Sequence, residues 1–240
     1  LLHLKNGLEN ARTPMRTAAL EMGIGGKAVK KAFDEAYTQQ MRCMAEMKMF
    51  GQQALAELES DAEKIGVVIF SRSYNGLVEE ANMGIPRKLA SRGILVLPFD
   101  FLPFDHWKPK RHMYWGTGQM ILKAARFVKQ HPQLFGVFIT NFSCGPDSFL
   151  VGYFRSIMGK KPSLTLELDS HTADAGIDPR IEAFADIVAA FRQLVRRQKI
   201  DMAEHPFKTT QISLVNGRAT VVTAAGEKVM LTDPRVTVLL

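Results

Sequence analysis

The sequence has few cysteines and no long apolar run. Its 240 residues include two cysteines, Cys43 and Cys144, too few for a disulfide framework, so we expect a reducing, cytoplasmic setting. Two cysteines alone also cannot form a four-cysteine zinc or iron–sulfur site. No apolar stretch approaches the roughly 20 residues of a membrane-spanning helix, and we expect no membrane association.

Both ends of the sequence lack the features of a natural terminus. Residues 1–7 have no initiator Met and no signal-peptide pattern, and residues 236–240 form a strand-like run without a following turn. We therefore expect the chain to be part of a longer protein.

The composition is that of an ordinary globular protein, with 46% hydrophobic and 23% charged residues and a net charge of +7. Positive charge gathers in residues 101–131, where six Lys or Arg accompany one Asp. This segment can attract phosphate groups or an acidic partner, or it can be a solvated surface. Aromatic residues among the cations of 105–115 suit single-stranded nucleic acid, but no second such stripe exists, so we expect no nucleic-acid partner.

Residues 1–63 are predicted to be a helical segment, either part of an upstream subdomain or packed on the next one. Apolar residues recur near a 3.6 period between 27 and 59 without a proline. This pattern predicts one long helix, or two helices broken near Gly51. Cys43 and its neighbours Met44, Met47 and Met49 are expected in helix packing rather than in a soft-metal site.

From residue 64 to 200, strand and helix patterns alternate. The predicted strands are 65–70, 94–100, 135–140 and 163–169, and the predicted helices are 82–92, 114–130, 149–158 and 180–197. This alternation predicts a three-layer α/β domain with a mostly parallel sheet. Residues 201–240 break the rhythm, because Asn216-Gly217 between two β-rich runs indicates a β-hairpin tail.

The third predicted strand leads directly into Cys144. Gly145, Pro146 and Asp147 follow, and a proline and an acidic residue suit the first turn of a helix. Cys144 is thus expected between the carboxyl end of a strand and a helix start, where α/β sheets bind ligands and a thiolate forms readily. The alternative is a small core residue.

Polar side chains follow every predicted strand. In chain order these groups are Arg72, Tyr74 and Asn75; Asp100, Asp105, His106 and Trp107; Asn141, Cys144 and Asp147; and Asp169, His171, Thr172 and Asp174. Parallel strands end at one edge of a sheet, so the four groups are expected to form one site.

The last group, together with Glu167 in the strand before it, allows several chemistries. Glu167, Asp169, His171 and Asp174 can hold a hard metal ion or act as acid and base, as in a hydrolase that uses His171 and Asp174. They can equally solvate a loop and cap the next helix. No glycine-rich phosphate motif supports a phosphate site, and residues 23–28 lack the spacing of a P-loop.

Several segments resemble one known family. They are SRSYN (71–75), NMGIPRKLASRGILVLPFDFLP (82–103), NFSCGPDSF (141–149) and LELDSHTADAG (166–176). Together they resemble the acyl-CoA dehydratase activase-related family, the large relatives of 2-hydroxyglutaryl-CoA dehydratase and its activator, over about residues 23–195. The family usually has Gly-Arg-Pro-Tyr-Asn at 71–75 and Thr-Arg near 178–180, where this chain differs.

The resemblance implies flavodoxin-like (Rossmann-like) α/β subdomains and a [4Fe–4S] cluster held by cysteines from different subdomains. Cys144 would be one metal ligand, the other ligands would lie upstream, and Cys43 matches none of the family's cysteine motifs. The cofactor-binding residues expected around the cluster are Arg72, Tyr74, Asn75, Asn141, Asp147, Asp169, His171 and Asp174.

The expected function is low-potential electron transfer to an acyl-CoA-type substrate, with a partner dehydratase subunit and an ATPase activase domain elsewhere in the parent chain. This chain alone is expected to be inactive and to hold no stable cluster. The alternative is a non-redox scaffold or regulatory domain that binds a partner subunit or a CoA-like phosphate ligand.

Overall fold

The computed structural model describes residues 7–141, 145–168 and 176–198 and three strands between 212 and 230. The chain divides into two compact units, Leu1–Ile200 and Asp201–Leu240. The predicted boundary between residues 63 and 64 lies inside the first unit and stays a prediction. In the described part of the chain, no helix is both long and apolar enough to cross a membrane.

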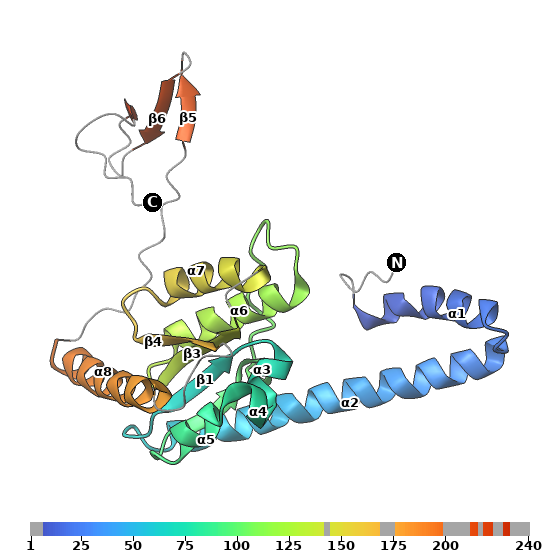
Figure 1. Ribbon diagram of the computed structural model, residues 1–240, viewed down its shortest axis with the longest axis horizontal. Coiled ribbons are helices and arrows are strands. Elements are labelled where there is room, and N and C mark those ends of the chain that lie inside the picture. Colours follow the sequence, from blue (N-terminus) through green and yellow to red (C-terminus); the bar gives the residue numbers. More distant parts are fainter. Residues whose placement is uncertain are drawn as a thin grey trace. The chain divides into compact units, whose positions relative to one another are not determined.

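The first unit contains a four-stranded, all-parallel sheet (Figure 1). Its strands are β1 (Gly66–Phe70), β2 (Leu95–Pro98), β3 (Leu134–Asn141) and β4 (Ser163–Leu168), in the spatial order β2-β1-β3-β4. Gly66 is in register with Leu95 on one side and with Leu134 on the other. The chain therefore moves from β1 to one neighbour first and then crosses over β1 to build the other side of the sheet.

Helices cover both faces of this sheet. They are α5 (Ile85–Ala90), α6 (Gly116–Gln130), α7 (Pro146–Met158) and α8 (Ile177–Gln198). One core joins the sheet to α6 and α7, and a second core joins the opposite face to α5 and α8. The prediction of a three-layer, flavodoxin-like α/β fold is thus confirmed.

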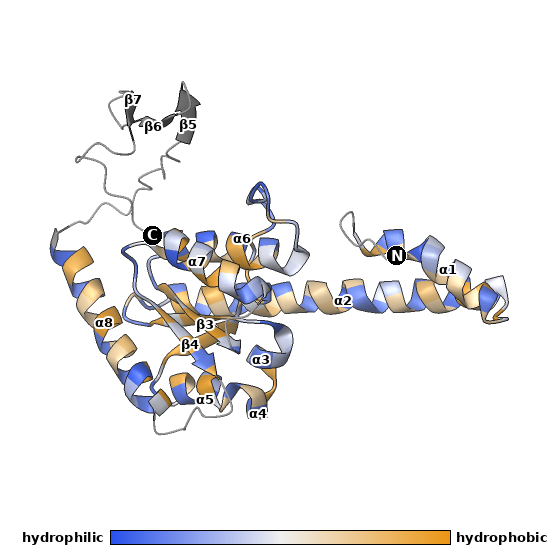
Figure 2. Cartoon of the chain, turned by 45° about the horizontal axis from the view of Figure 1, so that its top comes forward, coloured by the Kyte–Doolittle hydropathy of each residue, from blue (hydrophilic) through white to orange (hydrophobic). Residues whose placement is uncertain are grey.

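The sequence of β3 explains its central place in the sheet. Seven of its eight residues are buried, because a strand covered on both faces needs apolar side chains on both. In Figure 2 much of the sheet around the label β3 is orange. On one face, Phe138 meets the ring of Phe154 from α7 at 5.4 Å, and Phe154 meets Phe70 of β1 at 5.0 Å between ring centroids.

The amino-terminal part is helical, as expected. A short 3-10 turn, η1 (Leu8–Ala11), leads into α1 (Arg12–Glu21) and then α2 (Gly26–Glu59). Helix α2 is continuous, so the expected alternative of a break near Gly51 is wrong. Gly51 instead allows close packing on η2 (Phe99–Phe101), because a Cβ atom there would lie 2.0 Å from the carbonyl oxygen of Phe101.

Two local predictions also need correction. No helix was predicted between residues 71 and 81, but Ser73–Leu77 forms a short helix, α3, followed by α4 (Glu79–Asn82). Cys43 was expected in helix packing and is exposed. Met44 and Met49 are likewise 42% and 45% exposed, because α2 has more apolar surface than its neighbours cover.

The second unit contains an antiparallel sheet of β5 (Ile212–Val215), β6 (Arg218–Val222) and β7 (Lys228–Met230), in that order. β5 and β6 pair antiparallel, with Ile212 opposite Val221, which confirms the predicted hairpin. The strand-like run at 236–240 lies outside the described residues.

Candidate functional site

The sheet order creates a switch point between β1 and β3. The chain leaves the carboxyl end of β1 toward α5 on one face, and leaves β3 toward α7 on the other. At such a point the two connections diverge, and open α/β sheets bind their ligands in the resulting crevice. The segments after β1 and β3 carry five of the predicted site residues that the structure describes.

An ion pair joins these two segments. Nε of Arg72, just after β1, donates to Oδ1 of Asp147 in the first turn of α7 at 3.0 Å. The other carboxylate oxygen, Oδ2, accepts a hydrogen bond of 2.8 Å from the hydroxyl of Thr140 in β3. The side chain of Asp147 is 4% exposed. Removing Arg72 from this ion pair would leave the charge of Asp147 buried and unpaired, which strongly destabilises the fold.

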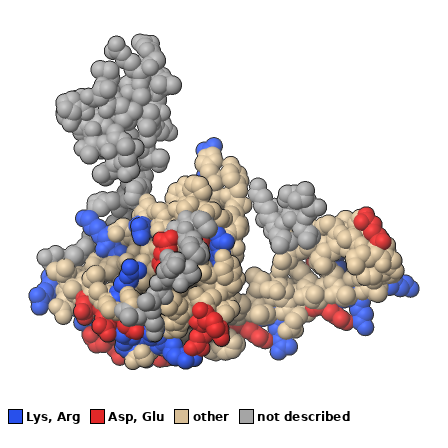
Figure 3. All heavy atoms as spheres, viewed as in Figure 1, with Lys and Arg blue, Asp and Glu red and all other residues tan. Residues whose placement is uncertain are grey.

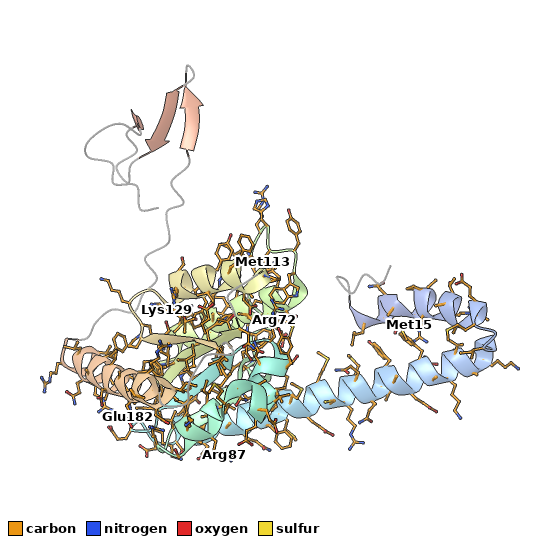
Figure 4. All side chains as sticks on the ribbon, in the orientation of Figure 1. Met15, Arg72, Arg87, Met113, Lys129 and Glu182 are labelled. Carbon is orange, nitrogen blue, oxygen red and sulfur yellow. The ribbon has the colours of Figure 1, made fainter. Side chains whose placement is uncertain are left out.

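Arg72 has two further neighbours. Its Nη1 donates to the hydroxyl of Tyr74 at 3.2 Å, and its guanidinium lies 5.5 Å from the ring centroid of Trp115. Burial opposes the charge of Arg72, but the hydrogen bond and the negative charge of Asp147 outweigh burial, so the pKa of Arg72 is raised. In Figure 4, Arg72 lies beside the carboxyl end of the sheet. A fixed positive charge therefore stands at the switch point.

Two amide side chains at the same edge have unpaired polar atoms. Asn75 in α3 is fully buried, and neither its nitrogen nor its oxygen has a partner among the described residues. The same holds for the buried Oδ1 of Asn141 at the end of β3. Buried polar groups in folded proteins are nearly always hydrogen-bonded, so these amides indicate a place where a ligand or an ordered water completes the structure.

The start of α7 is set by its sequence. Gly145 has φ 59° and ψ −131°, a conformation that residues with a Cβ atom rarely adopt. Pro146 occupies the first helical turn, where its missing N–H costs nothing, and Asp147 follows it. This local structure agrees with the prediction of a helix start directly after Cys144, although the helix begins three residues earlier than the expected 149.

The predicted site residues fall into two groups. Cys144, Asp169, His171 and Asp174 lie outside the described residues, so their roles stay predictions. Of the others, the structure pairs Arg72 with Asp147 and with Tyr74, and it buries Asn75 without a partner. Thr140 was not predicted as a site residue from the sequence. A hydroxyl residue near the end of an otherwise apolar strand was the sequence feature that could have indicated it.

The described residues do not by themselves fit an iron–sulfur cluster. Within the described segments, no group of three or more His, Cys, Asp or Glu can hold a metal ion. The one cysteine in these segments, Cys43, is exposed on α2. A [4Fe–4S] cluster needs four ligands, usually cysteines, and the whole chain has two.

Charge is mixed over the surface seen in Figure 3, where Lys and Arg (blue) and Asp and Glu (red) alternate along α2 and around the lower edge of the α/β part.

The basic segment of residues 101–131 makes contacts of its own. Nζ of Lys110 lies 4.5 Å from the ring centroid of Tyr153 on α7. Nη1 of Arg126 donates to the carbonyl of Lys108 at 3.3 Å. Part of the predicted basic segment thus holds its own loop against α6 and α7.

Comparison with known proteins supports the resemblance seen in the motifs. Residues 1–102 match the family model described as "CoA enzyme activase uncharacterised domain (DUF2229)". No curated protein and no solved structure matches the chain. The matched residues include α1 to β2 and contain Arg72, Tyr74 and Asn75. Over these residues the chain is similar to a CoA enzyme activase domain, which agrees with the resemblance seen in the motifs at 71–75 and 82–103.

Proposed function

We propose that the chain is the dehydratase-like part of a CoA enzyme activase-related redox protein, in which Cys144 supplies one thiolate ligand to a [4Fe–4S] cluster. When bound, such a cluster supplies low-potential electrons, here for an acyl-CoA-type substrate. Because the chain has two cysteines, the other ligands would come from another part of the full-length protein or from a partner dehydratase subunit. The ATPase activase domain would also lie outside this chain.

The observation that supports the proposal most is the bonded group of Arg72, Asp147 and Thr140. Asp147 lies three residues after Cys144 in the sequence, and Thr140 lies four residues before it. The hydrogen bonds of Asp147 to both partners therefore fix both flanks of the Cys144 segment at the switch point. A helix that starts two residues after a cysteine in the sequence favours the thiolate form that binds iron.

The experiment is anaerobic iron–sulfide reconstitution of the full-length protein, with iron and sulfide counts and EPR spectra. We expect Cys144→Ser to lose the cluster, whereas the matched control Cys43→Ser keeps it. This chain alone should take up no stable cluster. A Cys144→Ser protein with unchanged iron and sulfide would refute the proposal.

A second candidate is a non-redox scaffold that binds a partner subunit or a CoA-like phosphate ligand. It is favoured by Nη2 of Arg72, which has no hydrogen-bond partner among the described residues, on a side chain that is 28% exposed. Titration with pyrophosphate separates the two functions. Binding that is lost in Arg72→Met but unchanged in Cys144→Ser, without any cluster in the full-length protein, would favour the scaffold.

A further inference from the structure

A cavity of about 620 Å³ lies at the carboxyl ends of β1 and β2. Ser71, at the end of β1, and Pro98, at the end of β2, form its base, and residues of α3, α4 and α5 form one wall. Arg72 and Asp147 do not line it, because they pair across the opposite side of β1, toward β3. The cavity is therefore a different site from the switch-point group. Its volume is in the range that holds small-molecule ligands.

The walls of this cavity are mainly apolar. Ile69 and Val96 come from the sheet, Phe99 comes from η2, and Leu77 and Met120 stand at the rim. Leu77 is 59% exposed and Met120 is 36% exposed. Exposed apolar side chains around an apolar hollow gain most from a ligand with an apolar body, because such a ligand removes their surface from water.

Asp100 is a carboxyl group in this apolar surrounding. It lines the cavity from η2, and burial raises its pKa, although the hydrogen bond from its own backbone N–H and the charge of Lys48 oppose the shift. Lys48 is engaged elsewhere, since its Nζ donates to the carbonyl of Leu102 and lies 3.6 Å from Asp105. Among the described residues, no side chain forms a hydrogen bond or an ion pair with Asp100.

The other charged residues of the cavity neutralise each other. Glu79 and Arg87 both line it, and their side chains form an ion pair of 2.7 Å. Figure 4 shows Arg87 on the outer side of α5, away from the sheet. Asp100 is thus the lining residue whose charge has no ion-pair partner among the described residues, and its carboxylate can accept a hydrogen bond and repels an anion.

We propose that this cavity binds a small ligand with an apolar body and one uncharged hydrogen-bond donor, an amide N–H or a hydroxyl, which donates to Asp100. A ligand with a carboxylate in the same position binds more weakly, because a carboxylate cannot donate to Asp100 and would place two negative charges together in an apolar surrounding. The chemical class follows from the lining residues, and it is independent of whether Cys144 binds iron.

The test uses three probes of equal size: phenylbutanamide, phenylbutanol and phenylbutanoate. Binding is measured by calorimetry and by saturation-transfer NMR at pH 7.5. The amide and the alcohol should bind with similar affinity, and the carboxylate should bind at least about tenfold more weakly, which is a difference of about 1.4 kcal/mol.

Two pairs of variants give the controls. Asp100→Asn keeps the size and gains a donor, so it should remove the discrimination against phenylbutanoate. Asp105→Asn changes a carboxylate in the same loop that is 78% exposed and does not line the cavity, and it should leave the discrimination intact. Ala90→Trp fills the cavity from an exposed position of α5 and should abolish binding of every probe, whereas Ser91→Trp, one residue outside the lining, should not.

Each result decides the proposal. Equal binding of phenylbutanoate and phenylbutanamide to the unmodified chain would overturn it, as would no binding of any probe at millimolar concentration. Unchanged binding in Ala90→Trp would also overturn it, by placing the probes elsewhere. If Ala90→Trp fails to fold, Met120→Trp fills the cavity from α6 and gives the same decision.

Discussion

The sheet region and the helical hairpin of α1 and α2 use apolar residues in different ways. All five residues of β1 are buried, whereas the buried residues of the 34-residue helix α2 are Gly51, Leu55 and Leu58. Each strand of the sheet has helices on two faces, whereas α2 has the 10-residue α1 against part of its length and η2 and β2 against its later part. Apolar periodicity therefore predicts that a helix forms, and the number of packed neighbours decides how much of it is buried.

The largest expected effect is a core truncation in the sheet region. Phe154→Ala removes a fully buried ring that contacts Phe70 and Phe138, and it should lower the free energy of unfolding by about 3–5 kcal/mol. In the hairpin, Phe33→Ala removes a partly exposed ring stacked on Tyr37 and should cost less than about half as much. Urea unfolding measures both, and equal losses would mean that the two regions are packed alike.

The junction of the two regions gives the next effect. Gly51→Ala places a methyl group against the carbonyl of Phe101 and should destabilise the chain by about 1–3 kcal/mol, because backbone must move. Gly26→Ala, at the other end of α2, meets no atom closer than 3.9 Å and should be neutral or slightly stabilising. A harmless Gly51→Ala would show that α2 is not tightly docked on η2.

A pH dependence belongs to the sheet region. Nζ of Lys161 is buried and donates to carbonyls at the end of α6, including that of Val128 at 2.7 Å. Burial, together with the charge of Lys129, lowers the pKa of Lys161 from 10.5 to about 7. The unfolded chain therefore holds more protons than the folded chain between these values, and stability rises with pH by up to about 1.4 kcal/mol per unit.

The measurement is urea unfolding at several pH values between 6.5 and 9.5. Lys161→Met should flatten the rise, whereas Lys30→Met, on the exposed face of α2, should keep it. A rise that is unchanged in Lys161→Met would assign the pH dependence to other groups.

The smallest effect concerns the exposed apolar face of α2. Met44→Gln should change the free energy of unfolding by less than about 0.5 kcal/mol, because Met44 is 42% exposed. A loss near 2 kcal/mol would show that this face is covered in solution, and analytical ultracentrifugation would then reveal self-association.

The sequence predicted the regular elements of the sheet well. The apolar run at 135–140 and the Gly-Pro after it are local signals, and β3 and the start of α7 follow from them. Helix α3 was missed because five residues containing Asn75 and Gly76 show no apolar period.

The sequence predicted where the site residues lie, at the carboxyl edge of the sheet, but it did not predict which of them contact each other. Arg72 and Asp147 are 75 residues apart, and a sequence pattern places them at one sheet edge without pairing them. The unpaired amide of Asn75 and the cavity at Asp100 depend on tertiary packing, which no local pattern encodes.

The continuity of α2 has a mechanical consequence. At 1.5 Å per residue, about 38 Å of helix separates Gly26 from the contact at Gly51. A tilt of about 5° at that contact displaces the α1 end by roughly 3 Å, because an α-helix behaves as a stiff rod over this length. At this contact α2 packs against η2, and η2 also contains Asp100, which lines the cavity. A small tilt of α2 therefore couples a large displacement of α1 to a small movement at the wall of the cavity.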